Sequence, residues 1–201
     1  MIIISSTNRS RTSTQHRAIN KDYYVTPIKP IESFLKEFEK SEDVFLHNPI
    51  ILDPCAGGDN KHEMSYPKAI KDTYNDCNRL YTMDIREDSL ANLKIDYLTY
   101  NTENIKPNVI ITNPPFNLAI DIIEKALNDV ADNGFVIMLL RLNFFGGKLR
   151  KPFFEKQMPK YCYVHSKRIS FTDTGGTDSI EYCHMVWQKE YYPEFTQLKI
   201  I

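Results

Sequence analysis

Glycine is scarce in this chain of 201 residues, which contains only seven, about half of the roughly 7% that is usual in proteins. This scarcity excludes collagen-like and glycine-rich low-complexity sequences. Six of the seven glycines form three adjacent pairs, at 57–58, 146–147 and 175–176. Because glycine adopts backbone conformations that other residues avoid, each pair marks a place where the chain turns sharply or approaches something closely.

Further absences narrow the class of protein. No apolar run approaches the roughly 18 to 20 residues that span a bilayer, and the apolar start at residues 1–4 is too short for a signal peptide. The four cysteines form no Cys-x-x-Cys pair, so the sequence predicts neither a zinc knuckle nor a redox motif. The formal net charge of −1 neither demands nor excludes a polyanionic partner. We therefore expect a soluble cytoplasmic protein without metal or membrane contact.

The chain is predicted to consist of an N-terminal arm and a single domain. Residues 1–21 are rich in Ser, Thr, Asn and Arg, and they carry Arg9, Arg11, Arg17 and Lys21 without any acid. We interpret this segment as a flexible basic arm, either a solvated tail or an arm that lies along phosphates. Residues 22–201 are predicted to form one domain, since the chain is 42% hydrophobic and long enough for one core.

The pattern of apolar residues predicts the fold class. Short apolar runs without alternation indicate buried strands at 50–52, 80–83, 109–112 and 135–140. Apolar residues at helical spacing predict a helix over 118–130 and an earlier one that begins at Pro30. Strand, helix and strand in succession are typical of βαβ units, so we expect an α/β fold with a doubly wound, mostly parallel sheet. Two later segments, 161–165 and 182–187, are predicted to form an antiparallel C-terminal strand pair.

A basic segment at residues 148–168 contains seven Lys or Arg residues against one acid, Glu155, with aromatic residues interleaved. Cations that bind phosphates and rings that stack on bases suit a surface that contacts nucleic acid. A solvated face whose aromatic rings turn into the core explains the pattern equally well. The candidate contacts to nucleic acid are Arg141, Lys148, Arg150 and Lys151.

Two motifs stand where predicted strands end. The loop Asp53-Pro54-Cys55-Ala56-Gly57-Gly58 follows the first strand, where glycines let the backbone approach a ligand, although an ordinary tight turn is the alternative. It has neither the Gly-x-Gly-x-x-Gly spacing of dinucleotide sites nor the Gly-Lys-Ser/Thr ending of a P-loop. Asp84 closes the second strand, at a position where a carboxylate can accept hydrogen bonds from a ribose.

The third motif, Asn113-Pro114-Pro115-Phe116, ends the third predicted strand. Consecutive prolines fix φ, remove two N–H donors and keep the residues before them extended. In such a stiff segment the Asn113 carboxamide and the Pro114 carbonyl can point at one planar amine, while Phe116 stacks on the base that carries it. We predict that these four residues are catalytic.

These motifs resemble those of the class I S-adenosylmethionine-dependent methyltransferases of the amino-group type, above all the DNA adenine-N6 methyltransferases. In its compactness the chain is similar to the phage and prophage versions. The family's tetrapeptide, Asp or Asn followed by Pro-Pro and an aromatic residue, is matched in full by residues 113–116. Its cofactor loop is matched except that Gly58-Asp59 stands in place of a spaced second glycine. The similarity covers roughly residues 20 to 188.

The resemblance implies a Rossmann-like fold, S-adenosylmethionine as cofactor, and transfer of a methyl group to the exocyclic N6 of adenine in DNA. It also implies that the segment ending in Thr26-Pro27 contacts the methionine part of the cofactor, and that Asp96 and Tyr97 lie near its adenine. Phe171 is a weaker candidate for the wall opposite Phe116. The implied cofactor-binding residues are Tyr23, Thr26, Pro27, Asp53, Pro54, Cys55, Ala56, Gly57, Gly58, Asp84, Ile85, Asp96 and Tyr97.

The sequence also departs from the family pattern. The stretch 59–67 does not resemble the usual helix after the cofactor loop, and we expect a lid or an extra substrate loop there. We expect no separate target-recognition domain, so specificity would come from the basic segment, the arm, the loops or a second subunit, in a homodimer or with a partner. The alternatives are methylation of RNA adenine or of a protein glutamine amide, and a non-catalytic methyltransferase-like subunit that binds nucleic acid.

Overall fold

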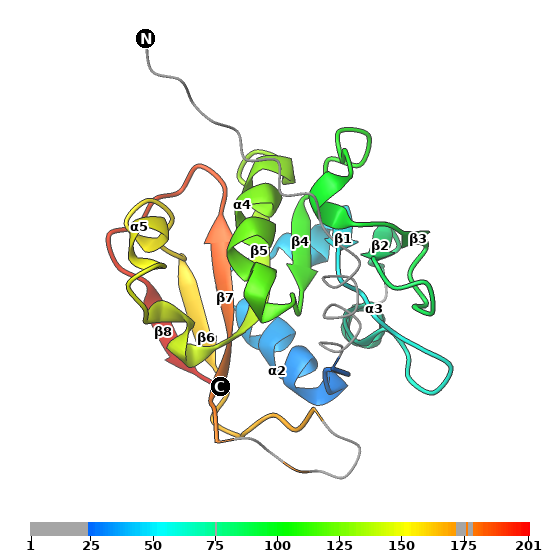
Figure 1. Cartoon of the computed structure of the whole chain (residues 1–201), viewed down its shortest axis with the longest axis horizontal. Helices are drawn as coiled ribbons and strands as arrows, with labels where there is room; N and C mark the ends of the chain where they lie inside the picture. Colours follow the sequence, from blue (N-terminus) through cyan, green and yellow to red (C-terminus); the bar gives the residue numbers. More distant parts are fainter. Residues whose placement is uncertain (1–23, 75, 172–175, 177–178) are drawn as a thin grey trace.

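The computed structural model describes residues 24–74, 76–171, 176 and 179–201 (Figure 1). The predicted basic arm at 1–21 and Tyr23 therefore lie outside the described residues, as does Gly175. No helix within the described ranges is long and apolar enough to cross a membrane.

An eight-stranded mixed sheet forms the centre of the described structure, with strand order β3-β2-β1-β4-β5-β7-β6-β8. Strands β3, β2, β1, β4 and β5 run parallel, β7 is antiparallel to both β5 and β6, and the edge strand β8 is parallel to β6. The bounds are β1 (Ile51–Asp53), β2 (Leu80–Asp84), β3 (Leu93–Lys94), β4 (Val109–Thr112), β5 (Phe135–Arg141), β6 (Tyr161–Val164), β7 (Tyr182–Gln188) and β8 (Gln197–Ile200).

Helices cover both faces of this sheet and give it two hydrophobic cores. One face packs against α4, through Ile122 and Ile123, and against α5; the other packs against α2, through Phe34 and Phe38, and against α3. The helices are α2 (Ile28–Phe38), α3 (Ser65–Thr73), α4 (Ala119–Asp129) and α5 (Lys151–Phe154), and short 3₁₀ turns are η1 (Val44–His47), η2 (Tyr97–Thr99), η3 (Phe116–Leu118) and η4 (Leu142–Phe145). The predicted doubly wound, mostly parallel α/β fold with antiparallel C-terminal strands is thus confirmed.

The strands with continuous apolar sequence form because both of their faces are covered. All four residues of β4 are buried, and their side chains alternate between the two cores: Ile110 belongs to one, Val109 and Ile111 to the other. A strand covered on both sides needs apolar residues at every position, which explains why the runs lack alternation.

One local expectation was wrong in part, and one strand was missed. The stretch 59–67 is not a loop throughout, because α3 begins at Ser65; Pro67 lies in its first turn, where a missing N–H breaks no helical hydrogen bond. The sequence reading also missed β8, an edge strand whose four residues are all exposed, so that no apolar pattern marks it.

Candidate functional site

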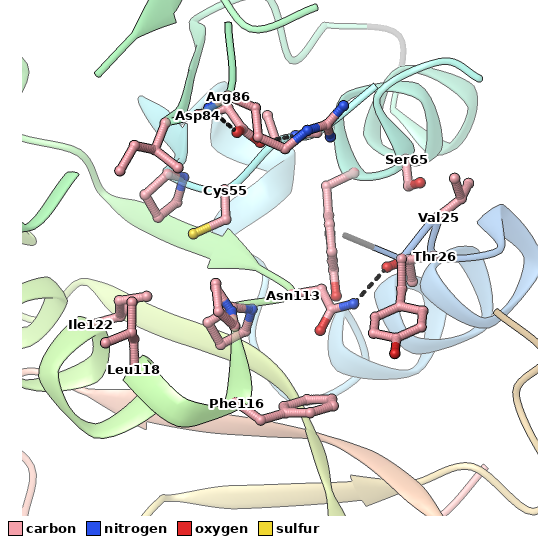
Figure 2. A pocket seen from close by; sticks show the side chains of 18 of the residues that line it. Val25, Thr26, Cys55, Ser65, Asp84, Arg86, Asn113, Phe116, Leu118 and Ile122 are labelled. Carbon is pink, nitrogen blue, oxygen red and sulfur yellow. Dashed lines mark hydrogen bonds between the residues drawn. The ribbon is translucent and has the colours of Figure 1, made fainter. Parts of the chain in front are cut away.

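A cavity of about 310 Å³ lies where β1, β2, β4 and β5 end, at the carboxyl edge of the parallel strands (Figure 2). Its walls come from the loops after these strands, from residues 24–26 before α2, and from the segment before β7. In open α/β sheets this edge is where ligands bind, above all where the strand order reverses, here between β1 and β4.

The loop after β1 owes its shape to two glycines with positive φ. Gly57 has a φ of 64° and Gly58 a φ of 76°, values that other residues rarely adopt. A Cβ at Gly58 would stand 2.9 Å from Cγ of Met64 and 3.0 Å from Cβ of Leu90, so the loop packs closely against these side chains. The protein's own side chains therefore already require a glycine at position 58, whether or not a ligand is bound.

Asp84 ties this loop to the end of β2. Its Oδ2 accepts a hydrogen bond from the Gly57 N–H and its Oδ1 one from the Arg86 N–H, both at 2.8 Å. Burial raises the pKa of Asp84, against the effect of these two backbone hydrogen bonds. A carboxylate has about four lone-pair positions, so it can accept further hydrogen bonds from a ligand in the cavity.

Asp53 lies beneath the loop and not in the cavity wall. Its side chain is buried, and Oδ1 accepts a hydrogen bond from the Cys55 N–H at 3.2 Å. Burial raises the pKa of this carboxyl to about 7. The structure thus gives Asp53 a role in shaping the loop.

The Asn113 carboxamide faces the cavity with its two ends in different surroundings. Nδ2 donates a hydrogen bond to Oγ1 of Thr26 at 2.9 Å, which Figure 2 shows as a dashed line. Oδ1 is shielded from solvent and accepts no hydrogen bond within the described part of the chain. Pro114 and Pro115 follow it in the cavity wall, so an unpaired acceptor is held on a stiff segment.

Aromatic rings also line the cavity. The Phe116 ring lies 6.1 Å from that of Tyr182, which in turn lies 4.8 Å from Phe171. Tyr24 meets Phe171 edge-on at 6.3 Å. The Arg141 guanidinium lies 4.7 Å from the centroid of Phe116, within the range of a cation–π contact.

Tyr24 and Tyr182 were missed by the sequence analysis. Tyr24 adjoins Tyr23 in the aromatic segment before Thr26, which is a usable signal. Tyr182 reaches the cavity because β7 pairs with β5 in a register that sets it beside Arg141, and no local pattern reveals that register.

Most of the predicted site residues line the cavity. Two of the implied cofactor residues, Pro27 and Asp53, do not, and neither do the basic candidates Lys148, Arg150 and Lys151. Those in the wall are Thr26, Pro54, Cys55, Ala56, Gly57, Gly58, Asp84, Ile85, Asp96, Tyr97, Asn113, Pro114, Pro115, Phe116, Arg141 and Phe171.

The basic segment 148–168 is more structural than its composition indicates. Phe153, Phe154 and Tyr163 are buried in the two cores. Arg150 donates from Nε to the carbonyl oxygens of Phe144 and Gly146, at 2.7 and 2.8 Å, and so holds the loop after η4. Lys148 and Lys151 are exposed.

A buried chain of hydrogen bonds supports the cavity wall from behind. The Tyr66 hydroxyl lies 3.0 Å from Nε2 of His184, whose Nδ1 lies 2.9 Å from Nε2 of His165. Burial lowers the pKa of both histidines, to about 4 for His165, so both rings are neutral at neutral pH. This chain fixes the position of Tyr66, a residue of the wall.

No protein-family model matches this chain, and no curated protein matches its sequence. Several solved structures match its fold. The type IIG restriction endonuclease BpuSI superposes with a TM-score of 0.64 at 10% identity, over 92% of this chain and 28% of that one. A putative RNA methyltransferase from Pyrococcus horikoshii superposes with a TM-score of 0.61 at 13% identity, over 84% and 87% of the two chains.

The 16S rRNA N2 G1207 methyltransferase of T. thermophilus, solved with AdoMet and guanosine, gives a TM-score of 0.50 at 15% identity, over 83% of this chain and 44% of that one. The chain thus spans less than two thirds of several proteins that it matches, 28% in the case of the endonuclease. Identities this low establish similarity of fold alone. The chain has the Rossmann-like fold of the class I methyltransferases.

Proposed function

We propose that this protein is an S-adenosylmethionine-dependent methyltransferase that modifies the exocyclic N6 of adenine in DNA. The observation that carries the proposal is the Oδ1 atom of Asn113. This acceptor is shielded from solvent and has no hydrogen-bond partner among the described residues, and the aromatic ring of Phe116 lies in the same cavity wall. An unpaired buried acceptor is costly, and a donor from a ligand would relieve that cost.

The cavity suits the proposed cofactor in size and chemistry. Its volume of about 310 Å³ falls in the range of small-molecule sites. The backbone of the loop 54–58 would lie against the cofactor, and Asp84 would accept hydrogen bonds from the ribose hydroxyls with the lone pairs that Gly57 and Arg86 leave unused. Asp96 and Tyr97 would border its adenine. S-adenosylmethionine supplies an electrophilic methyl group on a positively charged sulfur.

Asn113 and Pro114 would act on the substrate amine. The amino group of adenine is a poor nucleophile because its lone pair is delocalised into the ring. Hydrogen bonds from its two N–H groups to Asn113 Oδ1 and to the Pro114 carbonyl would favour a pyramidal nitrogen and stabilise the positive charge that develops on it. Held in this way, the nitrogen would form the C–N bond as the C–S bond broke with its electron pair on sulfur, and it would then lose one proton to solvent.

The aromatic residues would hold the base. A target inside a duplex must leave the stack, and the flipped base can then stack on Phe116. Tyr24, Phe171 and Tyr182 extend the aromatic wall beside it. Aromatic faces in the cavity wall favour a planar base over a glutamine side chain as the substrate. Adenine in RNA is the alternative substrate, which an assay must distinguish from adenine in DNA.

Replacement of Asn113 tests this assignment. We expect Asn113→Ala to lower the rate of tritium transfer from labelled S-adenosylmethionine to adenine-containing DNA by at least about 100-fold, since it removes an acceptor needed in the transition state. Asn117→Ala is the matched control, because Asn117 is exposed and does not line the cavity. Calorimetry should show that both variants still bind S-adenosylmethionine. Absence of binding by the unmodified protein would refute the enzyme assignment.

A further inference from the structure

The hydrogen bond between Asn113 and Thr26 joins two parts of the chain that lie 87 positions apart. Thr26 precedes α2, and Asn113 follows β4. The bond uses Nδ2 of the carboxamide and leaves Oδ1 as the end without a partner among the described residues. In Figure 2 both side chains lie in the cavity, with the carboxamide oxygen directed away from Thr26.

Thr26 is a firm support for this bond. This residue is only 4% exposed. The next residue, Pro27, has a φ of −61° and a ψ of 141° and leads directly into α2. That helix is fixed by Ile31 and Phe34, which are completely buried in the core on one face of the sheet. The hydroxyl of Thr26 therefore has little freedom to move.

Without this contact the carboxamide would be poorly oriented. An asparagine side chain has a broad rotational preference about its terminal bond, so its position depends on hydrogen bonds. The prolines at 114 and 115 fix the backbone after Asn113 but do not act on this rotation. Within the described part of the chain, the side chain of Asn113 forms its hydrogen bond with the Thr26 hydroxyl.

We propose that Thr26 is a positioning residue for methyl transfer: its hydroxyl holds the Asn113 carboxamide so that Oδ1 faces the substrate amine. This inference rests on the proposed function. It differs from the role that the family resemblance implies for Thr26, namely contact with the methionine part of the cofactor. The two roles predict different kinetic effects, because positioning acts on the rate of the chemical step, whereas cofactor contact acts on cofactor affinity.

The test compares Thr26→Val with Thr26→Ser. Valine removes the hydroxyl at nearly constant shape, and we expect a fall in kcat of about 10- to 100-fold, as for other small misplacements of catalytic groups. The dissociation constant for S-adenosylmethionine should stay within about twofold. Serine keeps the hydroxyl and should restore most of kcat. The control is Thr102→Val, a buried threonine outside the cavity, whose kcat should be unchanged.

Two results would overturn the proposal: a Thr26→Val enzyme with unchanged kcat, or one whose loss appears only as weaker binding of S-adenosylmethionine. A second measurement is independent of the substrate. The side-chain amide of Asn113, identified in NMR spectra by its loss in Asn113→Ala, should shift and exchange its protons faster in Thr26→Val than in Thr26→Ser. Unaltered amide signals would contradict the contact. An inactive native protein with altered signals would instead refute the proposed function, and with it the role in methyl transfer, while the contact between Thr26 and Asn113 would stand.

Discussion

Two aspartates at the ends of neighbouring strands each accept a hydrogen bond from the loop after β1. Asp84 lines the cavity and holds the Gly57 N–H, while Asp53 lies below the loop and holds the Cys55 N–H. Both carboxyls are buried enough that their pKa values rise. The loop is therefore ordered by two buried carboxyl groups, whose burial lowers the free energy of unfolding when they are ionised. This effect depends on pH.

The pH dependence of stability should reveal Asp53. In the folded protein its pKa is about 7, against 3.8 as its ordinary value. Between these values the folded state keeps a proton that the unfolded state has released, so the stability contributed by this group is complete below about pH 3.8 and is lost as the pH rises toward 7. The variant Asp53→Asn does not lose stability in this way. Its free energy of unfolding, relative to that of the native protein, should increase by about 1.4 kcal/mol for each pH unit between these two pKa values.

Urea unfolding of both proteins at several pH values between 4.5 and 7.5 would measure the difference, on the order of 1.4 kcal/mol for each unit of pH. A difference that stays constant over this range would show that Asp53 has an ordinary pKa in the folded state.

The sequence predicted which residues reach the cavity where their position at the end of a strand is enough to place them there. Asp84 ends β2 and Asn113 directly follows the buried strand β4, and the parallel sheet brings both to one edge. Tyr182 could not be placed in this way, because its approach to Arg141 depends on the pairing of β5 with β7. The contact between Thr26 and Asn113 could not be predicted either, because the family resemblance implied that Thr26 contacts the cofactor.

At the scale of elements, apolar content decided which strands could be predicted. β1, β2, β4, β5, β6 and β7 all contain runs of buried residues, whereas β3 has two exposed residues and β8 four. An edge strand is held by its backbone hydrogen bonds to one neighbour and so leaves little trace in the sequence. The basic segment is the opposite case. Its charge resembles that of a binding surface, but its aromatic residues belong to the hydrophobic core.

The basic segment still offers two exposed cations for contact with phosphates. Arg150 is bonded to carbonyl groups of its own loop, whereas Lys148 and Lys151 are exposed and Lys151 makes only an exposed ion pair with Glu155, so the two lysines are the better test. We expect the double variant Lys148→Glu and Lys151→Glu to weaken DNA binding by about tenfold or more, and to reduce the slope of log affinity against log salt by about 2. Fluorescence anisotropy with a labelled duplex at several salt concentrations measures both quantities.

Lys36→Glu is the control for this variant, because Lys36 is an exposed lysine of α2, which packs on the face of the sheet opposite α5. Equal affinities for the native protein and the double variant would exclude Lys148 and Lys151 from the binding surface.

At the scale of the whole molecule, the strand order accounts for the position of the site. The order reverses between β1 and β4, and the loops that follow these two strands supply the glycines and the Asn-Pro-Pro-Phe segment of one cavity. The sequence predicted this arrangement because alternating strands and helices leave few topologies open. It did not predict how α2 and α3 pack behind the site, where Thr26 and the bonded pair of Tyr66 and His184 stiffen the cavity wall.

Identification of the methylated atom tests the central claim most directly. The native protein would be incubated with labelled S-adenosylmethionine and matched substrates: a DNA duplex, the same duplex without adenine, an RNA of the same sequence, and a glutamine-containing peptide. Digestion and chromatography then identify the labelled product. The account predicts N6-methyladenine from adenine-containing DNA and no label in the duplex without adenine. Label in RNA or peptide but not in DNA, or no transfer by a protein that binds S-adenosylmethionine, would contradict it.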